Sequence, residues 1–361
     1  MTGTLPDIVV SNFHRRFTGV SATVKTLVPI QRQTVDIAVV DTGNLGLGGE
    51  WSIARLIVAA FRRPLQDRYR VFHVRRSIEM LLGVVLRDLF RQRWKLVFTA
   101  ASHRRPGSVQ GYLIGRMDAV VAVSSFSAHL QNWYSKIIPH GVDCTLFCPA
   151  GGPGGGADTG GLSDKRVIGH VARIRPPKGS GIFVDAMIRV LPEFPDAVGV
   201  LIGSCRPGDR TFKQSLVEKI EAAGLDERIV FVDEVGHDEL AVLYRDMYVC
   251  VSCSRSEGFG LTMLEALASG TPVIATRTGA APDLIDDETG VLFDIDDTDA
   301  LVGALRDFLA DPELVAEFGK AARDRAVGRH SVETEAQSLI QLYRQLMGGQ
   351  VPERQHPDQP G

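Results

Sequence analysis

The sequence predicts an α/β protein with two Rossmann-like domains that face a cleft. Short apolar runs alternate with amphipathic helical segments in both halves of the chain, a rhythm typical of parallel sheets with crossover helices. A glycine-rich stretch, AGGPGGGADTGGLS at 150–163, separates the halves and is typical of a flexible connection. The length of 361 residues also fits two domains.

The first half, residues 1–150, alternates apolar runs with helical segments and is expected to form the N-terminal domain. Its predicted strands are 8–10, 36–40, 69–73, 95–99 and 119–123, and its predicted helices are 21–29, 51–61, 77–92 and 112–117. The strand at 8–10 is followed by the loop SNFHRRFTGV, and the strand at 36–40 by the glycine-rich loop DTGNLGLGGE.

The same rhythm restarts after an expected linker at 151–163, so 164–330 is expected to form the C-terminal domain. Its predicted strands are 167–171, 198–203, 229–232, 249–253 and 273–276, and its predicted helices are 181–191, 212–223, 239–244 and one beginning near Leu261. A last amphipathic helix is predicted at 333–347, followed by a disordered tail at 349–361.

The composition favours a location in the cytosol. No apolar run is long enough for a transmembrane helix, and residues 1–10 lack the basic and apolar regions of a signal peptide. Five cysteines without framework spacing suit a reducing compartment. Cys250-x-x-Cys253 lies in an apolar run and is interpreted as two core cysteines rather than a metal or redox site.

Charge is distributed unevenly along the chain. Residues 1–150 contain 19 Lys and Arg against 9 Asp and Glu, while the remainder contains 21 against 34. A basic first half indicates an anionic partner such as acidic lipid, a phosphorylated or carboxylated acceptor, or nucleic acid. Nucleic acid is disfavoured because the chain shows no recognition motif and no aromatic residues interleaved with the basic ones.

The most informative stretch is SRSEGFGLTMLEALASGTPVIAT at 254–276. Gly258 and Gly260 allow a tight turn and close approach to a ligand, and the helix near Leu261 directs its N-terminal N–H groups at the same loop, as an anion site does. Glu257 and Glu265 would repel a phosphate but accept hydrogen bonds from hydroxyls. The stretch therefore predicts a ligand with both a phosphate and hydroxylated rings.

This stretch resembles the signature of retaining GT-B glycosyltransferases of family 4 or group 1, whose pattern is Glu-Gly-Phe-Gly, two spaced glutamates and Gly-x-Pro-Val. The segments RIRPPKG, FHVRRSIEML and LVFTAAS are most similar to lipopolysaccharide-core mannosyltransferases. The resemblance implies a GT-B fold, a hexose donor, GDP-mannose in first place, and no cofactor or metal. It also implies that residues 331–348 form a helix crossing back to the first domain.

The same resemblance implies roles for individual residues. Arg173 and Lys178 would bind the donor diphosphate and neutralise the leaving group, and Glu257 would accept sugar hydroxyls. Donor-binding residues are expected at Glu265, for the ribose, and at Gly258, Phe259, Gly260, Leu261, Thr262 and Gly19. Solvated loop cations, and for Glu265 an exposed acid at a helix start, are the plain structural alternatives.

Acceptor contacts are expected at Arg15, Arg16 and His103. Many members of the resembled family carry a histidine where this chain has Ala101, so His103 or no side chain takes its place. His73, at a strand end, is interpreted as a satisfied structural histidine. In the turn IIPHGVDCTLFCP, His140 replaces the asparagine of the family's interdomain pattern.

These observations predict a cytoplasmic enzyme, peripheral at the inner face of the cell membrane, with a lipid-linked or polysaccharide acceptor. Two alternatives keep the same site: a transferase that uses a UDP-sugar, of glucose or N-acetylglucosamine type, and a nucleotide-sugar-binding protein without turnover. The choice of donor and donor hydrolysis without acceptor distinguish them.

Overall fold

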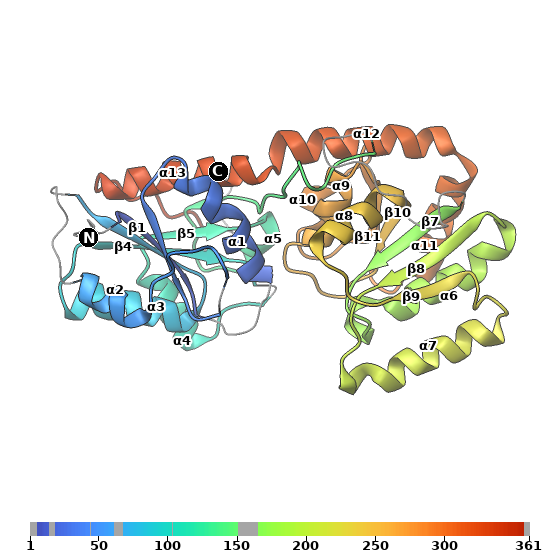
Figure 1. The fold of residues 1–361 in the computed structure, drawn as a ribbon, viewed down its shortest axis with the longest axis horizontal. Helices are drawn as coiled ribbons and strands as arrows, with labels where there is room; N and C mark the ends of the chain where they lie inside the picture. The colour runs from blue at the N-terminus through green and yellow to red at the C-terminus, as the bar shows by residue number, and fades with distance from the viewer. Residues whose placement is uncertain are drawn as a thin grey trace. The chain divides into compact units, whose positions relative to one another are not determined.

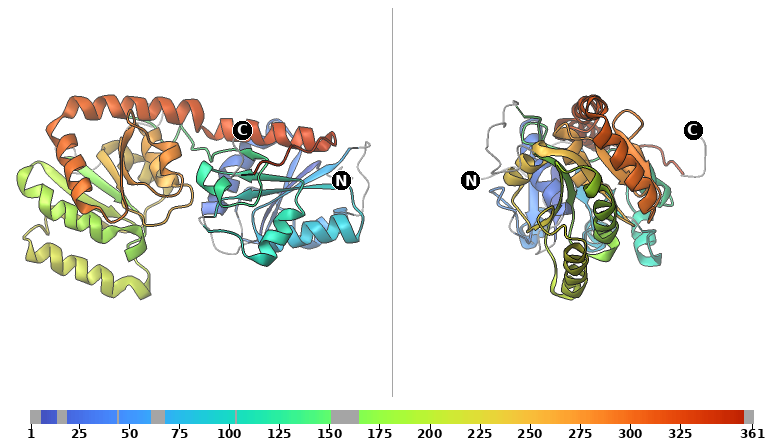
Figure 2. Two further views of the ribbon diagram at one scale, coloured as in Figure 1. Left: turned by 180° about the vertical axis from the view of Figure 1, so that it is seen from behind. Right: turned by 90° about the vertical axis from the view of Figure 1, so that its right-hand side faces the viewer.

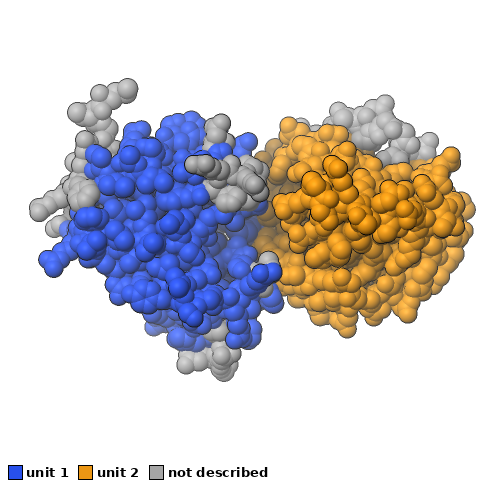
Figure 3. Space-filling model, turned by 90° about the horizontal axis from the view of Figure 1, so that it is seen from below, with its two compact units in different colours: residues 1–141, 332–361 blue, residues 142–331 orange. Residues whose placement is uncertain are grey.

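The computed structural model describes residues 6–13, 19–43, 45–60, 68–102, 104–150 and 165–356. The chain divides into two compact units, coloured in Figure 3. Unit 1 comprises residues 1–141 and 332–361, and unit 2 comprises residues 142–331. The expected linker at 151–163 lies outside the described residues, and residues 142–150, expected in the first domain, cluster with unit 2.

Unit 1 is built on a six-stranded parallel sheet in the order β2-β1-β3-β4-β5-β6. Its strands are β1 (Ile8–Asn12), β2 (Ile37–Asp41), β3 (Arg70–Val74), β4 (Trp94–Ala100), β5 (Ala119–Ala122) and β6 (Lys136–Ile137). Every residue of β1, β3 and β5 is buried, as expected for strands covered on both faces.

Helices cover both faces of this sheet (Figures 1 and 2). On one face, α1 (Gly19–Arg32) and α13 (Val332–Met347) share a core that includes Leu27 and Leu339. On the other face, α2 (Ile53–Ala60), α3 (Ser77–Val84) and α4 (Ser108–Gly115) pack on a core that includes Leu56, Met80 and Leu113. A short helix, α5 (Ser125–His129), follows β5.

Two polar side chains of the C-terminal helix α13 make buried contacts with the rest of unit 1. Glu335 accepts a hydrogen bond from the Gly141 backbone N–H at 2.7 Å and contacts His140 Nδ1 at 3.0 Å. Tyr343 Oη contacts His73 Nδ1 at 2.6 Å. His140, which replaces the asparagine of the family pattern, therefore fixes the turn at 140–141 to α13.

Unit 2 repeats the architecture with a second six-stranded parallel sheet, in the order β12-β11-β10-β7-β8-β9. Its strands are β7 (Arg166–Val171), β8 (Ala197–Ile202), β9 (Ile229–Val232), β10 (Met247–Ser252), β11 (Val273–Thr276) and β12 (Gly290–Phe293). The two parallel sheets confirm the predicted α/β class with two Rossmann-like halves.

The helices of unit 2 also form two layers (Figure 1). One layer contains α6 (Ser180–Val190), α7 (Arg210–Ala222) and α11 (Thr298–Ala310), whose apolar faces join one core. The other contains α8 (His237–Asp246), α9 (Leu261–Ala268) and α12 (Pro312–Arg329), with α9 in contact with both neighbours. A short helix, α10 (Ala281–Leu284), follows β11.

Several elements differ from the sequence-based expectation. The helix expected at 112–117 is α4, which begins earlier, at Ser108, and the helix expected at 77–92 changes from α3 to a π-helix, η1 (Val85–Leu89). Residues 349–356 were expected to be disordered, but Gln355 pairs with Tyr134 and the Arg354 guanidinium stacks on Trp133. Residues 357–361 lie outside the described residues.

Within the described ranges, no helix combines the length and the apolar character needed to cross a membrane.

Candidate active site

Three charged residues predicted to contact the donor lie at the carboxyl edge of the unit 2 sheet. Arg173 and Lys178 follow β7, and Glu257 follows β10, which is the neighbour of β7 in the sheet. Parallel strands end at the same edge, where α/β proteins bind their ligands. The sequence signature and the basic turn, far apart in the chain, therefore meet in one region.

Glycines hold the Glu257 loop in its conformation. Gly260 has φ 85° and immediately precedes α9, a left-handed conformation that favours glycine. Gly279 has φ 58°, and a Cβ atom there would overlap the backbone of Glu257 and Gly258. The turn after β11 thus packs directly on the signature loop, and no larger residue fits between them.

A second glycine joins the basic turn to the same loop. The turn is the short 3₁₀ helix η2 (Pro176–Lys178), and Gly179, with φ 74°, starts α6. A Cβ atom on Gly179 would overlap the Cys253 carbonyl, and the Arg255 N–H donates to the Pro177 carbonyl at 3.0 Å. The two loops are therefore fixed to one another through their backbones.

This contact brings Lys178 and Glu257 together. Lys178 Nζ donates to Glu257 Oε2 at 2.5 Å, and the two side chains are 21% and 18% exposed. Glu257 Oε1 also accepts from the Gly258 N–H at 3.1 Å. Each side chain keeps about a fifth of its surface exposed, so a ligand can reach the pair and offer a new partner to either group.

Glu265 is buried, with 8% of its surface exposed. Tyr244 Oη donates to Glu265 Oε2 at 3.2 Å, and burial raises the pKa of Glu265 to about 8 despite this hydrogen bond. The alternative of an exposed helix-start acid is therefore wrong. A carboxyl group that is protonated at neutral pH donates one hydrogen bond as well as accepting others, and Tyr244 was not anticipated from the sequence.

Arg173 lies in a cluster of cationic side chains. Burial, and then Arg175 and Arg206, lower its pKa, whereas Asp209 and Glu234 raise it. Arg175 Nε is buried and, among the described residues, has no hydrogen-bond partner. Three arginines at the ends of β7 and β8 attract an anion, and only Arg173 among them is predicted from the sequence. The RIRPPKG spacing is the signal for Arg175, and the strand-end position is the signal for Arg206.

His170 and the paired cysteines of unit 2 are core residues. His170 Nδ1 contacts the Val251 carbonyl at 2.9 Å, its Nε2 contacts Ser180 Oγ at 3.3 Å, and burial lowers its pKa to about 4. Cys250 and Cys253 are buried free thiols, and burial raises the pKa of Cys250 to about 12. Within the described residues, no group of three or more potential ligands could hold a metal ion.

The remaining donor-binding predictions follow the backbone of α9 and α1. Leu261 and Thr262 are the first residues of α9, and Phe259 is buried beneath its start. Gly19 is the first residue of α1, and a Cβ atom there would meet nothing within 4 Å. Packing therefore does not require glycine at position 19.

The acceptor predictions fall mostly outside the described residues, which exclude Arg15, Arg16 and His103. His73 is described and completely buried. Its Nε2 contacts Thr99 Oγ1 at 2.6 Å and its Nδ1 contacts Tyr343, while burial, followed by Arg75 and His140, lowers its pKa well below the usual value. These contacts support its interpretation as a satisfied structural histidine.

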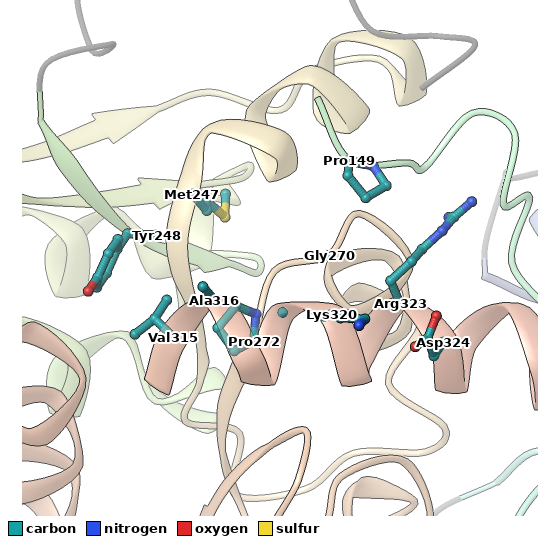
Figure 4. A pocket seen from close by; sticks show the side chains of 11 residues that line it. Pro149, Met247, Tyr248, Gly270, Pro272, Val315, Ala316, Lys320, Arg323 and Asp324 are labelled. Atoms are coloured by element: carbon teal, nitrogen blue, oxygen red, sulfur yellow. The ribbon is translucent and has the colours of Figure 1, made fainter. Parts of the chain in front are cut away.

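A groove of about 440 Å³ in unit 2 lies away from this region (Figure 4). Its lining includes Met247, the first residue of β10, Pro272, which precedes β11, and Val315 and Lys320 of α12. It is therefore at the amino edge of the strands, opposite the Glu257 loop, and is not the donor site.

Comparison with known proteins identifies the family. The model for "Glycosyl transferases group 1" matches residues 158–325. The lipopolysaccharide core biosynthesis mannosyltransferase LpcC of Rhizobium leguminosarum bv. viciae is 37% identical over 348 residues, 95% of this chain and 97% of that protein. The chain belongs to the group 1 glycosyltransferases. The corresponding enzyme LpsB of Rhizobium meliloti (strain 1021) is 36% identical over 349 residues, 94% of this chain and 98% of that protein.

Solved structures confirm the GT-B fold of this group 1 glycosyltransferase. A glycosyltransferase from Rickettsia africae ESF-5 has a TM-score of 0.76 at 19% identity and covers 94% of this chain and 98% of its own. Sucrose-phosphate synthase from Thermosynechococcus elongatus has a TM-score of 0.72 at 21% identity and covers 95% and 99%. The resemblance first drawn from Glu257, Glu265 and their neighbours is therefore confirmed at the level of family and fold.

Proposed function

We propose that this group 1 glycosyltransferase is a mannosyltransferase that uses GDP-mannose and acts on a lipopolysaccharide-core or other lipid-linked or polysaccharide acceptor. The observation that carries the proposal is the similarity to LpcC, 37% identity over 95% of the chain. A match of this extent includes both units rather than the donor-binding half alone, and so supports a similar acceptor as well as a similar donor.

The arrangement in unit 2 supports a different binding role for each of its charged groups. Arg173 and Lys178 bind the diphosphate, and Arg175 and Arg206 add to the positive potential that attracts it. Glu257 exchanges its contact with Lys178 for hydroxyls of the transferred sugar. Glu265 binds the ribose hydroxyls from its buried position, and the N-terminus of α9 directs its N–H groups toward phosphate.

The proposed reaction retains the anomeric configuration. The bond between the anomeric carbon and the diphosphate oxygen breaks, and the acceptor hydroxyl oxygen forms the new bond on the same face. The leaving diphosphate takes the hydroxyl proton, so the products are the glycoside and GDP that carries this proton until it is released to solvent. Charge grows on the diphosphate as the bond breaks, and placing Arg173 and Lys178 beside it stabilises the transition state more than the ground state.

The proposed location is the cytoplasmic face of the cell membrane, to which the enzyme binds peripherally. A lipid-linked acceptor is presented at a bilayer surface, and residues 1–150, with 19 Lys and Arg against 9 Asp and Glu, are suited to an anionic one.

A transfer assay tests the function directly. Purified protein is given GDP-mannose, UDP-glucose or UDP-N-acetylglucosamine, each with a detergent-solubilised lipopolysaccharide-core acceptor, and the product is analysed by mass spectrometry and NMR. We expect hexose addition only with GDP-mannose, and an α linkage from the α-configured donor.

The Lys178→Ala variant is the control for catalysis by this site. Preference for a UDP-sugar would overturn the donor assignment, and a β linkage would overturn retention. Tight binding of GDP-mannose with neither transfer nor hydrolysis would identify a binding protein instead.

A further inference from the structure

Large exposed apolar side chains gather on one side of unit 1. Of the twelve such side chains among the described residues, eight lie on or next to α2, α3, η1 and α4, and only Ile295 and Val327 belong to unit 2. We call these eight residues the outer apolar face: Ile57, Val58, Ile78, Leu81, Leu89, Phe90, Val109 and Tyr112.

The topology explains why these helices share a side. The connections β2-to-β3, β3-to-β4 and β4-to-β5 all advance in one direction across the sheet, and right-handed crossovers then place α2, α3 and α4 on the same face. Figures 1 and 2 show the three helices together, on the side opposite α1 and α13. Their outward side chains therefore form one surface.

Two of these helices are apolar on both sides. In α4, Leu113 and Ile114 are buried in the core, while Val109 and Tyr112, one turn apart, are 76% and 67% exposed. In α3, Met80 is buried while Ile78 and Leu81 are 58% and 47% exposed. A surface helix normally turns polar residues outward, so this pattern indicates that something apolar covers the outer side.

The same region is strongly basic. Residues 68–118 contain 11 Lys and Arg against 3 Asp and Glu. Glu79 is buried, and Asp88 and Asp118 are paired with Arg87, the former also with Arg116 and the latter also with Lys95.

Exposed arginines adjoin the apolar side chains. Arg91 directly follows Phe90, and Arg104 and Arg105 precede the first turn of α4, which carries Val109. With every acid of the region buried or paired, its outer surface is apolar and cationic.

We propose that the outer apolar face is a membrane-docking surface that enters the headgroup region of an anionic bilayer. The inference rests on the proposed function in one respect, that the acceptor is lipid-linked. Apolar side chains at the acyl boundary and cations at the phosphates are the two components of interfacial binding, and tyrosine prefers the same depth. Self-association through this face would instead bring like charges together, which is unfavourable.

Adjacent arginines of the basic first half do not contribute equally to this surface. Arg104 and Arg105 are exposed, whereas Nε and Nη1 of Arg75 are buried, so Arg75 cannot present its whole guanidinium group to a lipid phosphate. The pair Arg62 and Arg63 lies outside the described residues.

Vesicle flotation without donor or acceptor tests the inference. The wild-type protein is compared with a triple variant, Leu81→Gln with Val109→Gln and Tyr112→Gln, and with the pair Arg104→Ser and Arg105→Ser. The matched control is Ile295→Gln with Val327→Gln, since each of these unit 2 side chains is 45% exposed. Vesicles contain phosphatidylcholine alone or with phosphatidylglycerol, at low and high ionic strength.

We expect the wild type and the control to bind phosphatidylglycerol vesicles. The triple variant should bind at least about tenfold more weakly at either ionic strength, because the transfer of apolar side chains into the bilayer is not screened by salt. The variant that replaces Arg104 and Arg105 should bind about tenfold more weakly than the wild type at low ionic strength, and the difference should be much smaller at high ionic strength. Equal binding by the wild type and the triple variant would overturn the inference. So would self-association that the triple variant abolishes while vesicle binding persists, which would assign the face to a protein contact.

Transfer to the detergent-solubilised acceptor separates this inference from the proposed function. Turnover without vesicle binding would refute only the docking surface. Vesicle binding without turnover would refute only the assignment as an enzyme. All of the substituted side chains are exposed, and circular dichroism of each variant confirms that it is folded.

Discussion

Replacing Glu265 with glutamine should change how the stability of unit 2 depends on pH. The folded protein holds the proton of Glu265 up to a pKa of about 8, whereas the unfolded chain releases it near the ordinary pKa of 4.5. Between these values the folded state binds more protons than the unfolded state, so the free energy of unfolding falls as pH rises. The destabilisation is absent well below pH 4.5 and complete above pH 8.

The size of the effect follows from the two pKa values. A full proton corresponds to about 1.4 kcal/mol per pH unit, and titration of both states between pH 6.5 and pH 8 gives about 1.6 kcal/mol. His170 and His330 oppose this trend at lower pH, because burial lowers the pKa of each to about 4. Unfolded histidine is still half protonated near pH 6.5, so this contribution fades only above about pH 7.5. It is the same in Glu265→Gln, and the difference between the two proteins therefore isolates Glu265.

The assay is urea denaturation of the wild type and Glu265→Gln, followed by far-ultraviolet circular dichroism. The three tryptophans, Trp51, Trp94 and Trp133, all lie in unit 1, so their fluorescence reports a transition that the substitution should leave unchanged. We expect the variant to gain stability relative to the wild type by about 1.6 kcal/mol from pH 6.5 to pH 8. A difference that is constant, or that grows as pH falls, would refute a raised pKa for Glu265.

Three further predictions concern the same region. If ribose hydroxyls are bound by ionised Glu265, calorimetry should show GDP affinity rising from pH 6 to about pH 8 in the wild type and not in Glu265→Gln; a flat wild-type profile would contradict this role. Arg173→Ala and Lys178→Ala should each lower kcat/KM by about a hundredfold, roughly 3 kcal/mol, while Arg189→Ala, which breaks an exposed pair with Asp299, should not; normal turnover in both would remove these cations from the mechanism. Gly179→Ala should cost more than about 1 kcal/mol of stability because its Cβ atom would overlap the Cys253 carbonyl at a positive φ, whereas Gly303→Ala, with open space in α11, should be neutral or stabilising in thermal melts.

The strands were predictable because strands buried on both faces of a parallel sheet are continuous apolar runs. The bounds of the helices were less predictable than the strands. Gly111 interrupts the apolar pattern of α4, and the sequence therefore predicted a start four residues late, at Tyr112 instead of Ser108. No elements were assigned at 277–332, although Asp311 before Pro312 is a helix-start signal, and its side chain does cap α12.

The site was predictable in its parts and not in its contacts. The motif and the strand-end rule place Arg173, Lys178 and Glu257 at one edge, and that is where they lie. The pairing of Lys178 with Glu257 spans 79 positions and depends on backbone contacts made by Gly179 and Arg255. Similarly, the partner of Glu265 is Tyr244 on a separate helix, and no local pattern connects the two.

The difference in burial between the two glutamates suits two different tasks. Glu257 is partly exposed and is paired with a flexible lysine side chain, so it can change partners each time a sugar enters and leaves. Glu265 is buried, and an ionised carboxylate there lacks solvent, so a ligand that supplies hydrogen bonds to the charged form gains what water cannot provide. A hydroxylated ring bound at Glu265 would therefore be held more firmly than one bound at Glu257. Firmer binding at Glu265 than at Glu257 fits a donor that is held by its nucleotide while its sugar is transferred to the acceptor.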